Sequence, residues 1–379
     1  MSWRLRTRAL GLNVFIPLVA VVLALATVAL LLVAVGSNPL DAYRDMWNAA
    51  LGDRFALSTT VTKTMPRLLA ALGIALALRA GLWNIGAEGQ LYLGALATTA
   101  VALHEPDLGA PVMIAAALVA GALAGAVWAM IPGVLRATRG VSEVITSLML
   151  VYVAIQLTNY VLESPWAEPG STFPSSPYVP DGASLPTIVA GTLLNAGALV
   201  GLVLVAFAWF LMSRSTFGLR LNAIGGNERA ARIAGVRVSL MIVLAMAASG
   251  AFAGLAGGME VLGVRGRLVE GFSPGYGFEA IAIALLGRLN AFGILGAALL
   301  FGALDAGSAG LQTAAQGVPA SISQIAEGLA VAYVLVGFGI ATIIQRRRAA
   351  HAALRDAAKG PPAGEPDVLP ITPESVVDS

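Results

Sequence analysis

The chain has 379 residues, a formal net charge of +2, 58% hydrophobic residues and only 12% charged residues. Soluble domains carry about a quarter charged residues, so this composition excludes an ordinary soluble protein and indicates a chain surrounded by lipid. The sequence contains no cysteine, which further excludes disulfides, thiolate catalysis and cysteine-based metal sites.

The first apolar segment, 11–36, follows a basic start that contains Arg4, Arg6 and Arg8. Signal peptides share this order, but their apolar core is only about 7–15 residues long. The longer segment of this chain favours an uncleaved membrane helix over a cleaved signal peptide.

Apolar segments separated by polar or Gly/Pro-rich residues predict ten membrane spans, because about 20 apolar residues are needed to cross the hydrocarbon core. In chain order the predicted spans are 13–35, 62–80, 88–103, 110–131, 141–162, 187–212, 240–264, 278–286, 291–311 and 320–344. The eighth segment is too short to cross as a regular helix. We therefore expect an all-α, polytopic integral membrane protein whose transmembrane domain occupies residues 1–345.

The distribution of Arg and Lys predicts the topology. With ten spans and both termini in the cytoplasm, 17 basic residues lie inside and 6 lie outside, which satisfies the positive-inside rule. The outside group is Arg44, Arg54, Lys63, Arg67, Arg265 and Arg267. The segment 163–186, with six prolines and no basic residue, becomes an external loop able to contact a delivery protein. The proline-rich segment 346–379 is predicted to be a disordered cytoplasmic tail.

A cytoplasmic loop at 213–239 contains a short predicted helix at 227–235. Asn227 is a favourable N-cap, and Glu228 lies in the first turn, where the helix dipole favours an acid. Gly235 can end the helix in the left-handed conformation. The loop is thus predicted to project a two-turn helix from the membrane domain.

The faces of this short helix differ in chemistry. Ala230, Ile233 and Ala234 fall on one face, whereas Arg229 and Arg232 fall on another. Such a helix suits docking into a groove of a soluble partner, but an arginine-rich loop that obeys the positive-inside rule has the same composition. The candidate docking residues are Gly225, Gly226, Asn227, Glu228, Arg229, Ala230, Ala231, Arg232 and Gly235.

A glycine-rich break at 79–90 carries the polar residues Asn84, Glu88 and Gln90. A carboxylate at the bilayer centre costs about 2.5–3.5 kcal/mol on insertion scales, and non-helical backbone at that depth is tolerated inside protein or along a cavity. These residues are therefore candidates for lining a solute path. The alternative for Glu88 is that it caps the N-terminus of the third span.

Other polar residues in apolar surroundings extend the candidate list. Gln156 and Asn159, on the fifth span, could offer hydrogen bonds to a solute or could join helices. A second glycine-rich break occurs at 271–277. The acids expected to be path-lining or paired are Glu143, Glu260, Glu279, Asp305 and Glu327, with helix capping the preferred explanation for Glu143 and Glu279.

The sequence lacks the motifs of an enzyme. Its only lysines, Lys63 and Lys359, do not occur in a G-x-x-x-x-G-K-[ST] pattern, so the chain is not expected to hydrolyse ATP by itself. His104 and His351 have no metal-binding spacing, and no G-x-S-x-G elbow is present. We therefore expect neither a catalytic site nor a metal or cofactor.

Four segments together resemble a known family. They are GLWNIGAEGQLYLGA at 81–95, GVSEVITSLMLVYVA at 140–154, TFGLRLNAIGGNERAARIAGV at 216–236 and GFSPGYGFEAIAIALLGRLNAFG at 271–293. In this order they resemble the branched-chain amino acid and simple-sugar permease family of bacterial ABC importers, and within it the nucleoside, or purine nucleoside, permeases.

The resemblance implies a multi-pass protein of the bacterial cytoplasmic membrane that forms the translocation path for nucleosides. It implies two ABC ATPase subunits, a second permease subunit of the same or a homologous chain, and an extracytoplasmic solute-binding protein or lipoprotein. It also implies that 216–236 is the segment that couples the permease to the ATPases. The alternatives are the same machine with a simple sugar such as ribose or galactose, or an ion-coupled transporter that uses Glu88, Asp305 or Glu327.

Overall fold

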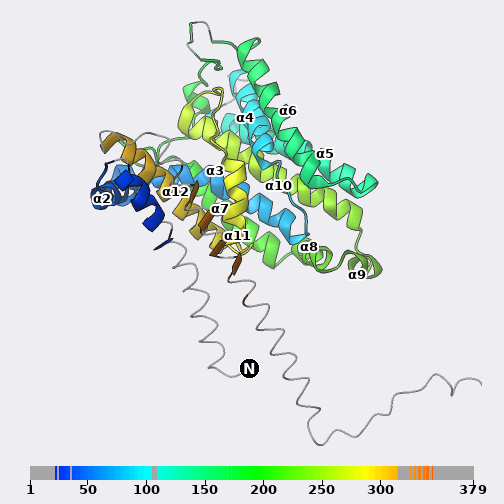
Figure 1. Ribbon diagram of the computed structural model, residues 1–379. Coiled ribbons are helices and arrows are strands. Elements are labelled where there is room, and N and C mark those ends of the chain that lie inside the picture. Colours follow the sequence, from blue (N-terminus) through cyan, green and yellow to red (C-terminus); the bar gives the residue numbers. More distant parts are fainter. Residues whose placement is uncertain are drawn as a thin grey trace, which may run out of the picture.

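The computed structural model describes residues 22–23, 25–34, 36–104, 109–168, 170–171 and 173–314, with isolated positions between 325 and 344. The tail at 346–379, most of the predicted tenth span and the first part of the predicted first span lie outside these residues. Between 25 and 314 the structure is built from helices joined by short links and one long loop (Figure 1).

The helices vary widely in length and tilt (Figure 1). They are α2 Pro39–Leu51, α3 Arg54–Arg79, α4 Ala87–His104, α5 Ala110–Arg139, α6 Glu143–Glu163, α7 Gly197–Ser213, α8 Thr216–Gly226, α9 Glu228–Ile233, α10 Val238–Glu260, α11 Tyr276–Leu286 and α12 Ala291–Ala314. A further helix, Leu25–Ala34, precedes α2, and the π-helix η2, Val261–Arg265, continues α10.

Helix α3 forms the centre of the bundle, where it packs against α10, α11 and α12 (Figure 1). Its residues from Leu68 to Ala77 are buried without interruption. A helix that is apolar on every face is stable only when it is enclosed, and this segment has no polar stripe to present outward. The core is therefore arranged around the second half of α3.

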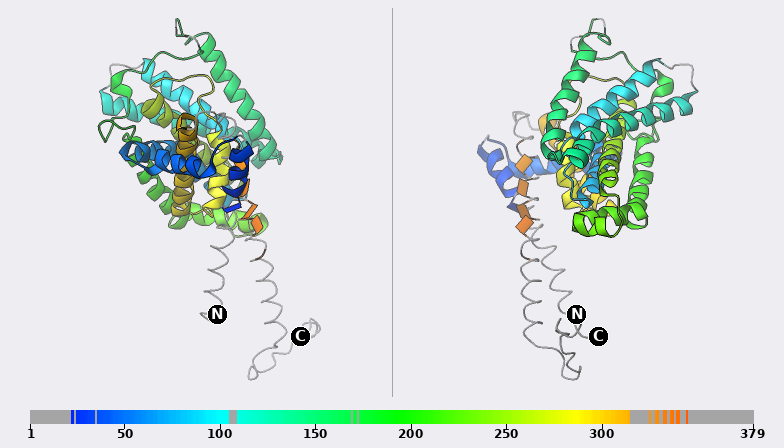
Figure 2. Two further views of the ribbon diagram at one scale, coloured as in Figure 1. Left: turned by 60° about the vertical axis from the view of Figure 1, so that its left-hand side comes forward. Right: turned by 90° about the vertical axis from the view of Figure 1, so that its right-hand side faces the viewer.

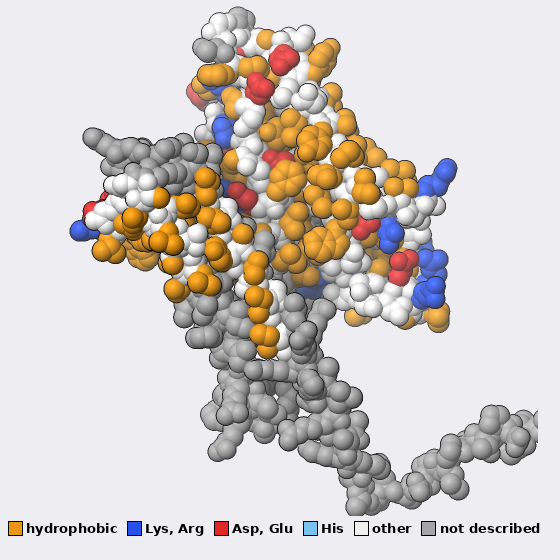
Figure 3. Space-filling view, in the orientation of Figure 1, with side chains coloured by type: hydrophobic (Ala, Val, Ile, Leu, Met, Phe, Trp, Pro, Cys, Tyr) orange, Lys and Arg blue, Asp and Glu red, His pale blue; other side chains and the backbone are white. Residues whose placement is uncertain are grey.

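The outer helices α5, α6 and α7 expose apolar side chains, as a surface that contacts lipid requires. Leu123 on α5, Tyr152 on α6 and Val203 on α7 each expose more than half of their surface. Figure 3 shows hydrophobic side chains spread over a broad face of the molecule, with most Lys and Arg side chains toward its edges and some Asp and Glu side chains within it. This pattern reverses that of a soluble protein.

Five of the described helices are long and apolar enough to cross a bilayer, and seven spans result if each of two bent helix pairs counts as one. The bent pairs are Leu25–Ala34 with α2, and α7 with α8, which meet at 60°. The all-helical, membrane-embedded class is thus confirmed. The count of ten spans and the cytoplasmic position of both termini stay predictions.

Most predicted spans coincide with a helix, and the differences have local causes. Helix α3 begins at Arg54, eight residues before the predicted second span, because Asp53 caps it by accepting a hydrogen bond from the backbone N–H of Ala56 at 2.7 Å. Helix α7 begins at Gly197, ten residues after the predicted start of the sixth span at position 187. Helix α2 was not predicted, because its sequence is only weakly apolar.

Helices α5 and α10 cross in close contact. The contact is made by Gly121 and Gly125 on α5 and by Gly250 and Gly254 on α10, a small-xxx-small pattern in both helices. A Cβ atom at Gly254 would clash with the backbone carbonyl of Gly121. Glycine is therefore required here by the approach of the two backbones.

Candidate functional site

The two glycine-rich breaks of the sequence meet in the structure. Glu88, in the first turn of α4, accepts a hydrogen bond at 2.6 Å from the backbone N–H of Gly277, in the first turn of α11. Nearby, the rings of Tyr92 and Phe272 lie 4.6 Å apart. The structure therefore joins 79–90 and 271–277, segments that sequence reasoning treated separately.

Glu88 is buried, and its carboxylate lies at the N-termini of both α4 and α11. Unpaired N–H groups and the positive end of the helix dipole favour a negative charge at this position. The recorded hydrogen bond of Glu88 is to α11, whereas the capping of α4 by Glu88 stays a prediction. A Cβ at Gly277 would clash with the Glu88 backbone, so this approach requires glycine.

Asn84 and Gln90 are buried and hydrogen-bonded to each other. The amide of Asn84 donates to Gln90 Oε1 and to Ser249 Oγ, both at 2.8 Å, and Gln90 Nε2 donates back to Asn84 Oδ1 at 2.9 Å. These bonds fasten the link between α3 and α4 to α10. In this structure the two amides act on the protein itself, so they line no described cavity.

Gln156 and Asn159 lie on α6, away from this network. Gln156 is exposed, and Asn159 is partly buried with its Oδ1 lacking a hydrogen-bond partner in the described part of the chain. No described contact joins either residue to Asn84, Glu88 or Gln90. The five path candidates therefore do not form one site.

A charged cluster that sequence reasoning missed lies between α3, α11 and α12. Arg67 of α3 has a side chain only 1% exposed; it pairs with Glu279 of α11 and, at 2.9 Å, with Asp305 of α12. Lys63, one turn earlier, contacts Asp305 at 2.7 Å. The Arg67 guanidinium also lies 4.5 Å from the centre of the Tyr276 ring.

This cluster changes how two basic residues are understood. The topology count placed Lys63 and Arg67 with the outer basic residues, and that placement stays a prediction. The structure shows that Arg67 lies in the middle of α3 and is enclosed by protein. Opposite charges on helices distant in sequence allow this burial, a compensation that a linear pattern does not reveal.

The other candidate acids are also paired. Glu260, the last residue of α10, accepts from Arg265 Nε at 3.1 Å, and Glu143 lies 3.4 Å from Arg136. Glu279 stands in the first turn of α11, as capping would require, yet its carboxylate pairs with Arg67. Glu327 lies outside the described residues.

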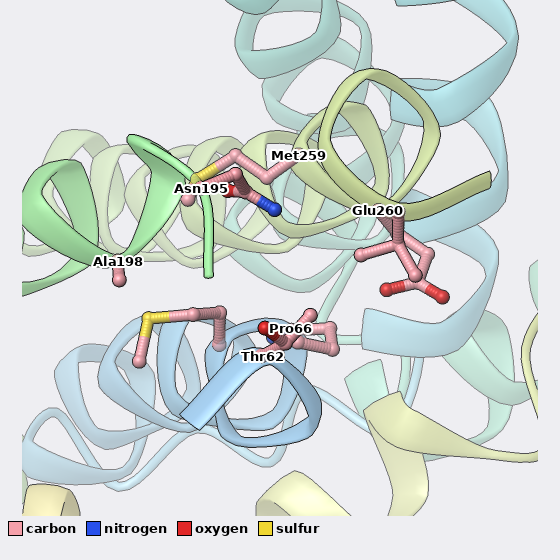
Figure 4. Close-up of a pocket in the computed structure, with 8 residues that line it drawn as sticks. Thr62, Pro66, Asn195, Ala198, Met259 and Glu260 are labelled. Carbon is pink, nitrogen blue, oxygen red and sulfur yellow. The ribbon is translucent and has the colours of Figure 1, made fainter. Parts of the chain in front are cut away.

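A small cavity lies beside Glu260 (Figure 4). It is lined by Thr62, Met65, Pro66, Asn195, Ala198, Met259, Glu260 and Val264, and its volume is about 10 Å³. Such a volume holds about one water molecule. A solute larger than water does not fit into this cavity.

The long loop 163–186 is irregular, as expected, and is fastened to the segment that follows α10. The backbone N–H groups of Ser176, Val179 and Leu185 donate to carbonyls of residues 268, 266 and 262, each at 2.8 Å. The Arg267 guanidinium lies 4.6 Å from the centre of the Tyr178 ring. The loop therefore covers the π-helix η2 and the chain leading to α11.

At the opposite end of the molecule, α8 and α9 lie across the ends of α7 and α10 (Figure 2, right). Helix α9 has the caps expected from the sequence: Asn227 Oδ1 accepts from the backbone N–H of Ala230 at 3.0 Å, and Gly235 has a φ of +82°. Helix α8 was not predicted. Gly225 and Gly226 form its last turn rather than a loop.

The side chains of α9 divide sharply by exposure. Arg229, Ala230 and Arg232 are exposed, and Ile233 is 89% exposed. Ala231 is instead buried against the protein, so it cannot contribute to an outer docking surface. Figure 3 shows Lys and Arg side chains gathered at the end of the molecule that carries α9. A large apolar side chain thus projects from a basic surface.

Gly225 connects this end to the core. A Cβ at Gly225 would clash with the carbonyl of Arg79, the last residue of α3. The Arg79 guanidinium in turn donates to Met212 O at 2.8 Å and to Leu289 O at 2.7 Å. The ends of α3 and α7, the start of the α11–α12 link and helix α8 therefore meet at one junction.

The family model described as the branched-chain amino acid transport system permease component matches residues 56–340. The chain is 38% identical to the glucose ABC transporter permease protein of Haloferax volcanii, over 84% of this chain and 86% of that protein. It is 35% identical to the guanosine ABC transporter permease protein of Bacillus subtilis, over 86% of this chain and 94% of that protein. It is 31% identical to the nucleoside ABC transporter permease protein of Lactococcus lactis subsp. cremoris, over 92% of this chain and 98% of that protein. No solved structure matches the chain significantly.

Proposed function

The chain belongs to the branched-chain amino acid transport system permease family, and from this premise we propose that it forms the nucleoside path of an ABC importer and receives the ATPase movement through α9. It is a multi-pass permease subunit and a non-catalytic transport component. The proposed setting is the bacterial cytoplasmic membrane, with both termini inside.

The substrate proposal is supported by the relatives. Two of the three relatives named above carry nucleosides or guanosine in their names, and each aligns over more than 90% of its own length. The relative named for glucose has the higher identity, so a simple sugar is the second candidate. Nucleosides and sugars share a ring that carries adjacent hydroxyl groups.

The ion-coupled alternative is less well supported. Asp305 forms ion pairs with the side chains of Lys63 and Arg67, and Glu88 accepts a hydrogen bond at the N-terminus of α11. An ion-coupled carrier would require such a group to release its partner during each cycle. Family membership supports ATP as the energy source instead.

The exposed apolar side of α9 is the observation that supports its coupling role. Ile233 is the most exposed large hydrophobic residue described, and it lies among arginines at the same end as the junction at Arg79. A hydrophobic anchor inside a polar rim is the usual centre of a protein interface. Movement of α9 would reach α3 through α8 and the close contact of Gly225.

The proposed partner proteins would contact different faces of the permease. Two ATPase subunits of the ABC type would serve the importer at α9 and its equivalent on a second permease, of the same or a homologous chain. A solute-binding protein or lipoprotein would contact the loop 163–186, which lies at the other end of the molecule (Figure 1). Uptake would then depend on all four components.

The coupling role is tested by Ile233→Asp, compared with Ala167→Asp in the loop at the opposite end, since both positions are exposed. A charge at the centre of a hydrophobic contact should lower copurification with the ATPase at least about tenfold, whereas Ala167→Asp should not. Ala231 is unsuitable because it is buried. Normal copurification of Ile233→Asp together with normal solute-stimulated ATP hydrolysis would contradict the docking role.

The substrate is tested with the cognate binding protein. Nucleosides, ribose, galactose and glucose are screened by thermal shift, and the ligands that bind are then supplied to the complete importer in vesicles. Stabilisation and ATP-dependent uptake of nucleosides would support the first candidate. Uptake of sugars alone would replace it with the second.

A further inference from the structure

The small cavity beside Glu260 combines a carboxylate and thioethers from helices with the amide of Asn195, which lies in the segment before α7. Thr62, Met65 and Pro66 come from α3, Ala198 comes from α7, and Glu260 ends α10. Figure 4 shows the Glu260 side chain extending from α10 toward α3, with Asn195 and Met259 beside each other on another side of the cavity. A carboxylate at the edge of an internal cavity requires an explanation, because burial of a charge is costly.

The carboxylate of Glu260 is only partly used by the protein. Its side chain is 5% exposed, and Oε1 accepts from Arg265 Nε at 3.1 Å. Among the described residues no hydrogen bond to Oε2 is recorded, and the carboxylate also interacts electrostatically with Arg67, Asp305 and Tyr276. Arg265 also donates to Phe272 O at 2.6 Å, which fixes the guanidinium. The ion pair therefore orients the acid and leaves acceptor capacity on its second oxygen.

The backbone next to Glu260 is also unusual. The π-helix η2 begins at Val261, immediately after this acid. Single π-helical turns occur frequently at functional sites, because the wider turn leaves carbonyls without their usual helical partners. Asn195 Nδ2 donates to one such carbonyl, Gly263 O, at 2.6 Å, and Asn195 Oδ1 accepts from Gly197 N at 2.9 Å. Asn195 thus fixes one wall of the cavity.

The opposite wall is held by weaker and more adaptable contacts. Thr62 Oγ1 donates to Leu193 O at 3.0 Å, and the Leu193 N–H lies 3.4 Å from Ser58 Oγ. The remaining closure is made by Met65 and Met259, whose unbranched side chains change shape readily. The cavity can therefore widen between α3 and residues 193–195 without disturbing the contact between α5 and α10.

We propose that this cavity is the closed form of a solute-binding position in the path, and that Glu260 recognises two adjacent hydroxyl groups of a sugar or ribose ring. This inference rests on the proposed function. A carboxylate can accept hydrogen bonds from both members of a diol, because its two oxygens provide about four acceptor sites. Thr62 adds a hydroxyl, and the methionines contact the apolar faces of the ring.

The test compares two conservative variants in the complete importer with its binding protein. Glu260→Gln keeps the shape of the side chain and removes its charge, and Glu270→Gln makes the same change at an exposed loop residue. Initial ATP-dependent uptake is measured for adenosine and for 2′,3′-dideoxyadenosine, and for glucose and 2,4-dideoxyglucose; neither deoxy compound keeps a pair of adjacent hydroxyl groups. The binding protein is identical in all samples, so its own selectivity cancels from the comparison.

Glu260→Gln should lower uptake of adenosine or glucose about tenfold to hundredfold, as expected for loss of a charge-assisted hydrogen bond. Uptake of the matching deoxy compound should change little, so the preference for hydroxyl groups should fall by the same factor. Glu270→Gln should behave as the unaltered importer. Retention of both rate and preference in Glu260→Gln would overturn the inference while leaving the proposed function intact.

A second measurement does not depend on altering Glu260. Because the sequence contains no cysteine, Ala198→Cys and Asn48→Cys each provide a single thiol, one in the cavity wall and one at an exposed position of α2. During turnover, adenosine or glucose should slow thiol labelling at position 198 at least about threefold by occupying the site, and should not slow it at position 48. Equal labelling with and without a transported solute would overturn the site.

A different result would contradict the proposed function itself. If the unaltered importer takes up neither adenosine nor glucose in the presence of ATP, the function and the inference are both overturned. If it takes up either solute, the comparison of Glu260→Gln with Glu270→Gln tests the role of Glu260 separately from the function.

Discussion

Two helix contacts in this protein are built in opposite ways. Helices α5 and α10 meet through glycines, with their backbones in direct contact. Helix α3 meets α11 and α12 through Arg67, Glu279 and Asp305. Lipid supplies no hydrophobic force between helices, so association must come from close packing or from polar contacts. The contact between α3 and α12 also includes a close approach of Gly302 to Thr64, so the charged pairs are what distinguish it from the contact between α5 and α10.

This difference indicates which of the two helix contacts can rearrange during transport. A glycine contact depends on one fit of two backbones, so sliding or opening it loses packing without any replacement. An ion pair can exchange its partner for water or for a hydroxyl group when the helices separate. We infer that α5 and α10 form the frame, and that the surroundings of α3 are the part that rearranges.

The largest effect should follow from breaking the charged contact. Arg67→Met would leave Glu279 and Asp305 without their main cation, and removal of one partner from a buried pair costs about 3–5 kcal/mol. The expected result is loss of monodisperse protein or a large drop in melting temperature, measured by fluorescence size-exclusion chromatography after heating. Arg54→Met, an exposed arginine in the same helix, is the control. Equal stability of the two variants would contradict the central role of the cluster.

The next effect should follow from one added methyl group in the frame. Gly254→Ala places a Cβ against the Gly121 carbonyl, and forcing atoms into a packed contact costs about 1–3 kcal/mol. Gly296→Ala on α12 is the matched control, because no atom lies within 4 Å of its added Cβ. Melting temperature in detergent should fall for the first variant and stay or rise for the second. A lower melting temperature for both variants would show that the loss of stability comes from replacing glycine in a helix and not from the contact with Gly121.

A smaller effect is expected at the edge of the charged cluster. Lys63 contacts Asp305 with a side chain 29% exposed, so water can replace part of the interaction. Lys63→Met should therefore cost only about 1 kcal/mol, well below the effect of Arg67→Met. The same thermal measurement ranks the two. If Lys63→Met equals or exceeds Arg67→Met, the contacts of Arg67 do not dominate the cluster.

The smallest effect belongs to α9. Arg232 and Glu228 form an exposed pair at 3.2 Å on one helix face, a type of pair worth about 0.3–0.5 kcal/mol. Arg232→Gln should leave the melting temperature of the permease unchanged within error at low and at high salt. A clear loss of stability would show that α9 is fastened to the bundle through this arginine rather than through Ala231.

Sequence reasoning succeeded where the cause is local. Apolar length placed α4, α5, α6 and α12 closely, and capping chemistry placed α9 between Asn227 and Gly235. It did not find partners that are distant in sequence. Nothing near Arg67 in the chain indicates that this arginine pairs with Glu279 and Asp305. Ala231 was grouped with the docking residues because a six-residue helix does not reveal which face meets its own protein.

The sequence by itself determined the lipid-embedded helical class, the short capped helix and the resemblance to ABC permeases, since composition, cap residues and motif blocks are all local properties. Only the tertiary structure decided that Glu88 binds the start of α11, that Asn84 and Gln90 bind each other, and that Glu260 borders a cavity. These outcomes depend on which helices become neighbours. A buried charge or amide takes its role from the group that folding places opposite it.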